Sequence, residues 1–185
     1  MIKRLFDVVV ASMVLFVLLP VMAVVAIAVR LDSPGSVIFR QQRVGLRERH
    51  FELLKFRSMV VGARQLGSYS TSSNDTRITP VGRFIRRTSL DELPQLVNVI
   101  KGDMSLVGPR PDVPEQAENY SPSEWTRRHM VRPGITGLAQ AVLRSEATPE
   151  QRKELDLNYV ERSGLSLDLW VLILTLGQLF GRRAN

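Results

Sequence analysis

The stretch VVVASMVLFVLLPVMAVVAIAV, residues 8–29, decides the fold because it contains no charged residue and must be kept away from water. As a straight helix it would reach about 33 Å, slightly more than the ~30 Å hydrocarbon core of a bilayer. A cleaved signal peptide is the first alternative, but its apolar run is usually only ~7 to 15 residues long. We therefore predict that residues 1–32 form a permanent membrane anchor.

Pro20 divides this apolar run into two arms. It cannot donate a hydrogen bond to the carbonyl of Phe16, and its ring crowds that turn, so a bend is expected. Each arm is then only about half a bilayer deep. Basic residues, which favour the cytoplasmic side, flank the run at both ends: Lys3, Arg4, Arg30, Arg40, Arg43, Arg47 and Arg49. We predict a re-entrant helical hairpin that enters and leaves by one face, with an ordinary single span as the alternative.

Residues 33–185 are predicted to form a catalytic domain that makes one integrated unit with the anchor, because 185 residues fit a single compact body. The fold class is α+β and mainly helical. The turn residues DSPG end the apolar segment, and residues 36–41 and 50–56 are expected to pair as a small β-hairpin. Residues 62–79 are small and polar, and they indicate either a mobile lid or a plain connector.

Three helices are expected further along the chain. One begins near Ser89, where S-L-D-E has a Ser-x-x-Glu capping pattern, and ends at Gly102. Another begins at Ser121, which proline and glutamate follow. Residues 165–180 are apolar but short and interrupted by polar side chains, which suits an amphipathic helix lying in the membrane interface. A buried core helix is the alternative for that segment.

The charge balance favours partners that carry phosphate. The chain has 25 Lys+Arg against 18 Asp+Glu, a net charge of +7, and no cysteine. Thiolate metal sites and disulfides are therefore excluded, and the two histidines match no metal-ligand spacing. The basic residues are not interleaved with aromatic ones, so no nucleic-acid partner is expected. The sequence contains no Gly-x4-Gly-Lys-Ser/Thr loop, which disfavours an ATP-driven enzyme.

Asp91 and Glu92 are adjacent carboxylates at the predicted start of a helix, after the basic residues Arg83, Arg86 and Arg87. A helix N-terminus and nearby cations both favour the ionised form. A charged carboxylate can act as a nucleophile and can hold Mg²⁺, which is usually shared with substrate phosphates. Acidic residues in a first helical turn also commonly serve only to complement the helix dipole.

Other polar residues are candidates for substrate or metal binding. Arg110 stands between two prolines whose fixed backbone presents its guanidinium with little entropy left to lose, although a solvated surface turn is the alternative. Lys55 and Arg57 project from the same face of a predicted strand. Asp156 and Tyr159 share a helix face, which makes Asp156 either a second acidic ligand or an ordinary exposed charge.

Six ordered segments resemble those of the bacterial sugar transferases, the monotopic phosphoglycosyl transferase superfamily, over nearly the whole chain. They are FDVVVASMVLFVLLP (6–20), DSPGSVIFRQQRVG (32–45), FELLKFRSM (51–59), RRTSLDELPQLVNVIKGDMSLVGPRP (86–111), VRPGITGLAQ (131–140) and LDLNYVERSGLSLDLWVLILT (155–175). The family usually has a serine immediately before the anchor proline, where this chain has Leu19.

The resemblance implies a Mg²⁺-dependent, two-step exchange at phosphorus. Asp91 would attack the sugar-bearing phosphate of a UDP-sugar and release UMP, and undecaprenyl phosphate would then take the phosphosugar from the aspartate. Glu92 would assist as a metal ligand or proton handler, since the metal would bridge the carboxylates and the diphosphate. The resemblance leaves the identity of the sugar, the pathway served and the oligomeric state open.

The same resemblance gives roles to three further residues: Lys55 and Arg110 would bind the substrate phosphates, and Asp156 would join Asp91 and Glu92 at the metal. We also predict that Arg57 and Arg86 bind substrate. The protein would be monotopic in the bacterial inner membrane, in contact with membrane lipid, with its catalytic part on the cytoplasmic face. A non-catalytic membrane-anchored adaptor that binds anionic lipid or nucleotide is the alternative function.

Overall fold

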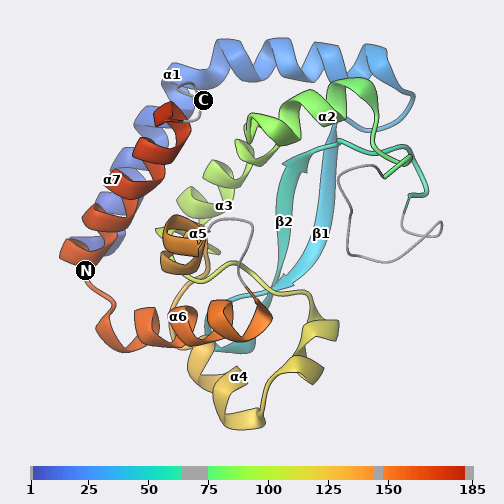
Figure 1. Ribbon diagram of the computed structural model, residues 1–185. Helices are drawn as coiled ribbons and strands as arrows, with labels where there is room; N and C mark the ends of the chain where they lie inside the picture. Colours follow the sequence, from blue (N-terminus) through green and yellow to red (C-terminus); the bar gives the residue numbers. More distant parts are fainter. Residues whose placement is uncertain (1, 64–74, 144–147, 182–185) are drawn as a thin grey trace.

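The computed structural model describes residues 2–63, 75–143 and 148–181, and it is mainly helical (Figure 1). Its α-helices are α1 (Ile2–Asp32), α2 (Pro80–Arg87), α3 (Gln95–Lys101), α4 (Pro122–Arg128), α5 (Leu138–Leu143), α6 (Pro149–Arg162) and α7 (Leu165–Gly181). Its strands are β1 (Ile38–Val44), β2 (His50–Phe56), β3 (Ser105–Val107) and β4 (Gly134–Thr136). Three 3-10 turns complete the order: η1 (Leu46–Glu48), η2 (Leu90–Glu92) and η3 (Pro114–Asn119).

The predicted anchor is a single long helix with Pro20 inside it. Figure 1 shows that α1 rises beside α7 from the N-terminus and then turns to run across the top of the molecule. The bend expected from the proline is present. The arms diverge and do not lie side by side, so the hairpin shape is not confirmed, because the helix continues through the bend.

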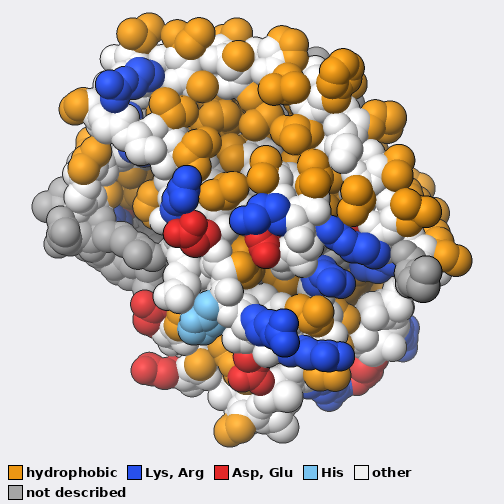
Figure 2. Space-filling model, turned by 180° about the vertical axis from the view of Figure 1, so that it is seen from behind, with side chains coloured by type: hydrophobic (Ala, Val, Ile, Leu, Met, Phe, Trp, Pro, Cys, Tyr) orange, Lys and Arg blue, Asp and Glu red, His pale blue; other side chains and the backbone are white. Residues whose placement is uncertain are grey.

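Each arm of α1 packs on a different part of the same body. Ala11 of the first arm belongs to a core cluster with Val99, and Val25 and Val29 of the second arm belong to a cluster with Phe56. The opposite face of the helix is apolar and exposed, for example at Phe16, Val24 and Leu31. The space-filling view shows hydrophobic side chains gathered over the upper part of the molecule, where α1 lies, and charged side chains below them (Figure 2).

The predicted β-hairpin is confirmed. Strands β1 and β2 pair antiparallel, from Ile38 opposite Phe56 to Val44 opposite His50. The first strand begins two residues later than expected and extends to Val44, since residues 42–44 continue the ladder before the turn. The predicted lid or connector at 62–79 lies mostly outside the described residues.

The predicted helix start at Ser89 is wrong. Ser89 has a left-handed backbone, with φ of 58°, and its side chain makes no capping hydrogen bond. The turn η2 follows, and α3 begins only after Pro94, whose ring nitrogen has no hydrogen to donate. The predicted end at Gly102 is confirmed, with φ of 100°. The start at Ser121 is also confirmed, because its hydroxyl accepts from the Glu124 amide at 3.3 Å.

A short parallel pair of strands, β3 and β4, was not predicted. Ser105 lies opposite Gly134, and Val107 lies opposite Thr136. A Cβ atom added to Gly134 would lie 2.1 Å from the Gly108 nitrogen, so only glycine allows this close approach. The pairing places the segment after β3, which carries Arg110, against residues 132–136.

The helix predicted at residues 165–180 is present as α7 and is partly buried, while its place in the membrane interface stays a prediction. Val171 and Asp168 are buried, whereas Leu169, Trp170 and Ile173 are exposed. The helix therefore packs one face on the core and leaves an apolar face uncovered.

Candidate active site

A cleft of about 1060 Å³ opens between the β-hairpin, α2, η2 and the segment after β3. Its lining includes six of the predicted site residues: Lys55, Arg57, Arg86, Asp91, Glu92 and Arg110. Such a volume accommodates a small-molecule substrate. The fold thus brings together residues that lie up to 55 positions apart in the sequence.

Glu92 is the centre of the polar contacts in this cleft. Its Oε1 atom accepts hydrogen bonds from Lys55 Nζ at 2.8 Å and from Arg110 Nη2 at 3.0 Å. Burial alone would raise the pKa of Glu92, but the charges and hydrogen bonds of Arg110 and Lys55 outweigh it and lower the pKa to about 2. Glu92 is therefore ionised and held by two cations.

Asp91 sits beside Glu92 in a different environment. Its side chain is buried, with 8% of its surface exposed. Burial is the largest effect and raises the pKa of Asp91 to about 6, against the opposing charges of Lys55, Arg86 and Arg110. We expected a helix terminus and cations to favour ionisation of both carboxylates. Glu92 follows that expectation with a lowered pKa. At Asp91, which lies in a 3-10 turn, burial outweighs the neighbouring charges and raises the pKa, although a value of about 6 still leaves most molecules ionised at pH 7.

Lys55 and Arg110 reach Glu92 from two directions. Lys55 stands near the end of β2, and burial lowers its pKa despite the attraction of Glu92. Arg110 follows β3, and its half-exposed side chain keeps much of its surface open to the cleft. The two cations leave room for an anionic ligand beside the carboxylates.

Arg57 lines the cleft, but its described hydrogen bonds go to the backbone at the end of α1 and in the turn that follows. Its guanidinium donates to the carbonyl oxygens of Val29, Ser33 and Ser36 at 3.1, 2.6 and 2.6 Å. These contacts fix the turn that leaves α1. Substrate binding by Arg57 stays a prediction.

Asp156 is located elsewhere. It is buried on α6, and its Oδ2 atom pairs with Arg128 Nη2 at 3.0 Å. Within residues 2–63, 75–143 and 148–181, no three acidic or histidine side chains form a metal-binding group, so Asp91, Glu92 and Asp156 do not converge. The shared helix face with Tyr159 is confirmed by the burial of both, but that face packs inside the protein.

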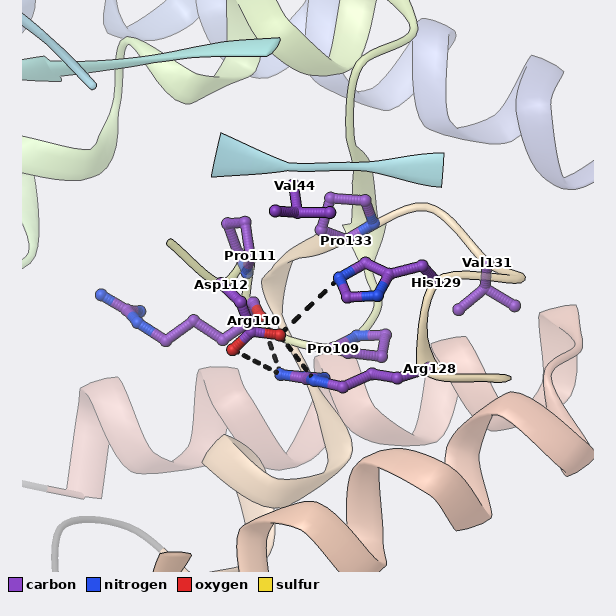
Figure 3. Close-up of a pocket in the computed structure, with 9 residues that line it drawn as sticks. All are labelled: Val44, Pro109, Arg110, Pro111, Asp112, Arg128, His129, Val131 and Pro133. Atoms are coloured by element: carbon purple, nitrogen blue, oxygen red, sulfur yellow. Dashed lines mark hydrogen bonds and ion pairs between the residues drawn. The ribbon is translucent and has the colours of Figure 1, made fainter. Parts of the chain in front are cut away.

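Arg128 and Asp112 belong to this buried group and were missed by sequence reasoning. Arg128 Nε donates to Asp112 Oδ2 at 2.8 Å, and His129 lies against the same carboxylate at 3.8 Å. Figure 3 shows these side chains facing one another, while the Arg110 side chain extends away from them. Their sequence contexts, RPDVPE and WTRRHM, look like charged surface segments and give no signal of burial.

Comparison with known proteins finds relatives that match nearly the whole chain. The family model described as "Bacterial sugar transferase" matches residues 1–182. The chain is 42% identical to the "UDP-glucose:undecaprenyl-phosphate glucose-1-phosphate transferase" of Escherichia coli (strain K12), over 100% of this chain and 41% of the relative. It is 40% identical to the "UDP-N-acetylgalactosamine-undecaprenyl-phosphate N-acetylgalactosaminephosphotransferase" of Aeromonas hydrophila, over 95% of this chain and 43% of the relative.

A shorter relative aligns over most of its length. The "Uncharacterized sugar transferase EpsL" of Bacillus subtilis (strain 168) is 42% identical, over 94% of this chain and 85% of the relative. The chain thus spans about two-fifths of the two longer relatives and most of this one.

Proposed function

The chain belongs to the bacterial sugar transferase family, and from this we propose that it moves a sugar 1-phosphate from a UDP-sugar to undecaprenyl phosphate through an aspartyl-phosphosugar intermediate, releasing UMP. The observation that carries the proposal is the cleft in which Asp91 and Glu92 lie among Lys55, Arg86 and Arg110. Such a site offers a nucleophile and cations that can bind a diphosphate.

Asp91 is the nucleophile in this proposal. Its carboxylate oxygen attacks the sugar-bearing phosphorus, the bond from that phosphorus to the bridging oxygen breaks, and UMP leaves with the bonding electrons. A phosphate oxygen of undecaprenyl phosphate then attacks the same phosphorus and the aspartate carboxylate leaves. Burial, which raises the pKa of Asp91 to about 6, makes the carboxylate a stronger nucleophile while leaving it ionised in most molecules at pH 7.

Glu92 and the cations orient the donor. Lys55 and Arg110 already converge on Glu92, so their remaining donors are placed to bind the oxygens of the diphosphate. Arg86, on α2, lines the same cleft and its charge acts on Asp91. These groups offset negative charge as the two anionic reactants approach.

The carboxylate pair fits Mg²⁺. Mg²⁺ prefers hard oxygen ligands and is commonly held by one or two carboxylates together with substrate phosphates, which is what Asp91 and Glu92 offer in the cleft. When bound, the ion would offset charge that develops on the diphosphate. Asp156 is not included in this set, because it does not line the cleft and lies buried beside Arg128.

We also propose that α1 is re-entrant and that the protein lies on the cytoplasmic face of the bacterial inner membrane. Both ends of α1 bind the same body: Arg4 donates to the Val99 carbonyl at 2.6 Å, and the Val29 carbonyl accepts from Arg57. A straight span would carry its ends to opposite sides of the bilayer. The continuous apolar surface of α1 and the exposed face of α7 support immersion to partial depth.

Partial immersion suits the acceptor. A polyprenyl phosphate keeps its tail in lipid and its phosphate at the interface, so a body anchored in one leaflet places Asp91 near the headgroup plane. Leu19, in place of the usual serine, leaves proline sterics to produce the bend.

The test is release of UMP by the purified full chain with Mg²⁺, undecaprenyl phosphate and a panel of UDP-sugars. UDP-glucose and UDP-N-acetylgalactosamine come first, because the relatives' names specify those sugars. We expect UMP from at least one donor, and none from Asp91→Asn although it folds. Binding of UDP-sugar without UMP release would instead favour a non-catalytic adaptor.

A further inference from the structure

Arg128 is a buried arginine at the end of α4, with 4% of its surface exposed. Its Nη2 atom donates to the backbone oxygen of Arg110 at 2.9 Å and lies 3.0 Å from Asp156 Oδ2. Its Nε atom donates to Asp112 Oδ2 at 2.8 Å. A buried charge requires partners, and the planar guanidinium fixes their directions. Two carboxylates thus hold one arginine in a single orientation against the Arg110 backbone.

The backbone around Arg110 is held on both sides. Its neighbours have fixed φ angles because they are prolines. The flanking carbonyl oxygens each accept a hydrogen bond: Pro109 from the Gly134 amide at 2.9 Å, Pro111 from Arg43 Nη1 at 2.8 Å and Asp112 from the Val44 amide at 3.0 Å. These contacts restrain the backbone on both sides of Arg110.

The Arg110 side chain points the other way. Figure 3 shows it extending from the segment away from Arg128 and His129. Its guanidinium reaches Glu92 in the cleft at 3.0 Å. One residue therefore connects the buried ion-pair group on its backbone side with the carboxylates on its side-chain side.

We propose that Arg128, oriented by Asp112 and Asp156, is a positioning residue that fixes the Arg110 backbone so that its guanidinium is held at the donor diphosphate. Asp156 acts through Arg128 and is not a metal ligand. The inference rests on the proposed function for the diphosphate that Arg110 meets. The inference assigns a role to the buried ion-pair group of Arg128, Asp112 and Asp156, which contacts neither Asp91 nor Glu92.

A double-mutant cycle tests this coupling, with UDP as the probe and the full chain in detergent micelles. Arg110→Ala and Arg128→Lys should each weaken UDP binding by roughly tenfold or more, since each disturbs a charge-assisted contact. In the Arg110→Ala background, Arg128→Lys should change the dissociation constant by less than about twofold, because coupled residues are not additive. An undiminished effect in that background would overturn the inference.

The variant Asp156→Asn tests whether Asp156 positions Arg128 or binds the metal. It also replaces Arg128→Lys in the double-mutant cycle if Arg128→Lys does not fold. The Mg²⁺ concentration for half-maximal UMP release should stay within about twofold of wild type, whereas loss of a metal-site contact typically costs about 10- to 100-fold in metal affinity. A tenfold rise would overturn the positioning role. Arg127→Lys is the matched control, because this neighbouring arginine pairs with Glu161 at the exposed surface.

Failure of the proposed function has a different signature. If Arg110→Ala binds UDP as tightly as wild type, Arg110 does not meet the diphosphate, and both proposals lose that residue. If only the coupling is missing, Arg110 keeps its role and the inference about Arg128 alone is wrong.

Discussion

Lys55 Nζ and Glu92 Oε1 lie 2.8 Å apart, and this contact joins the end of β2 to the turn that carries both carboxylates. Arg110 reaches the same oxygen atom, so Glu92 is committed to two cations. Asp91 does not accept those two hydrogen bonds. Its pKa is raised, whereas the pKa of Glu92 is lowered. The two adjacent carboxylates therefore differ in the way that separate roles as nucleophile and organiser require.

The first prediction concerns the pH dependence of the reaction. Burial raises the pKa of Asp91 to about 6, and a protonated carboxyl is not a nucleophile. The value of kcat/KM for UMP release should therefore fall as the pH drops through about 6, whereas the pKa of Glu92, about 2, adds no transition there. The measurement is a pH profile of initial rates at the lowest Mg²⁺ concentration that supports turnover, because a bound cation would lower the pKa of a carboxylate. An acid limb near pH 4 under that condition would show that Asp91 is not the group that titrates.

Asp91→Asn should stabilise the protein at neutral pH while abolishing activity. The folded-state pKa of Asp91 is raised from 3.8 to about 6, so its contribution to stability is present below pH 3.8 and is lost as the pH rises through about 6. Removing the charge should restore about 3 kcal/mol of unfolding free energy at pH 7 to 8. Thermal unfolding of both proteins across this pH range checks it. Equal or lower stability of the variant at pH 8 would contradict the buried-carboxylate account.

Asp7→Leu tests whether α1 is an integral part of the folded body. Asp7 is buried, and its carboxylate accepts from Ser105 Oγ at 2.8 Å and from the Leu106 amide at 3.2 Å. The change leaves both donors unpaired, so the unfolding free energy should fall by about 1 to 3 kcal/mol even though leucine is more apolar. Val9→Leu is the control, because Val9 is exposed on the same helix. In a simple span, Asp7→Leu would cost nothing.

Single-cysteine variants test the path of α1, since the chain has no cysteine of its own. Ile2→Cys and Leu31→Cys replace exposed residues at the two ends of the helix. In intact spheroplasts, a membrane-impermeant maleimide should label neither, and after lysis it should label both, because both ends face the cytoplasm in the proposed topology. Labelling of one end from outside would establish a span.

Helices whose boundaries depend on residues close in the sequence could be predicted from the sequence. The apolar run with Pro20 gave a long bent helix, the proline after Ser121 gave a capped helix, and the glycine at 102 ended one. The capping pattern at Ser89 failed because Pro94 delays the hydrogen-bonded helix, and the residues before it form a tighter turn. A local pattern is reliable only when no neighbouring residue imposes a stronger constraint.

Long-range partners were beyond the same reasoning. Helical spacing correctly placed Asp156 and Tyr159 on one face but did not show that Arg128 covers Asp156. Strands β3 and β4 have three residues each, too few for a periodic signal. No local pattern marks Asp7 as a buried residue, because its partner Ser105 lies 98 residues away.

The most direct test of the account is to trap the intermediate. Wild-type protein is mixed with Mg²⁺ and a UDP-sugar that supports UMP release, without undecaprenyl phosphate, and then quenched and digested for mass spectrometry. The account predicts one equivalent of UMP and a phosphosugar on the peptide that contains Asp91, discharged when undecaprenyl phosphate is added before the quench. Rapid turnover to the lipid product with no adduct on Asp91 at any time point would contradict it.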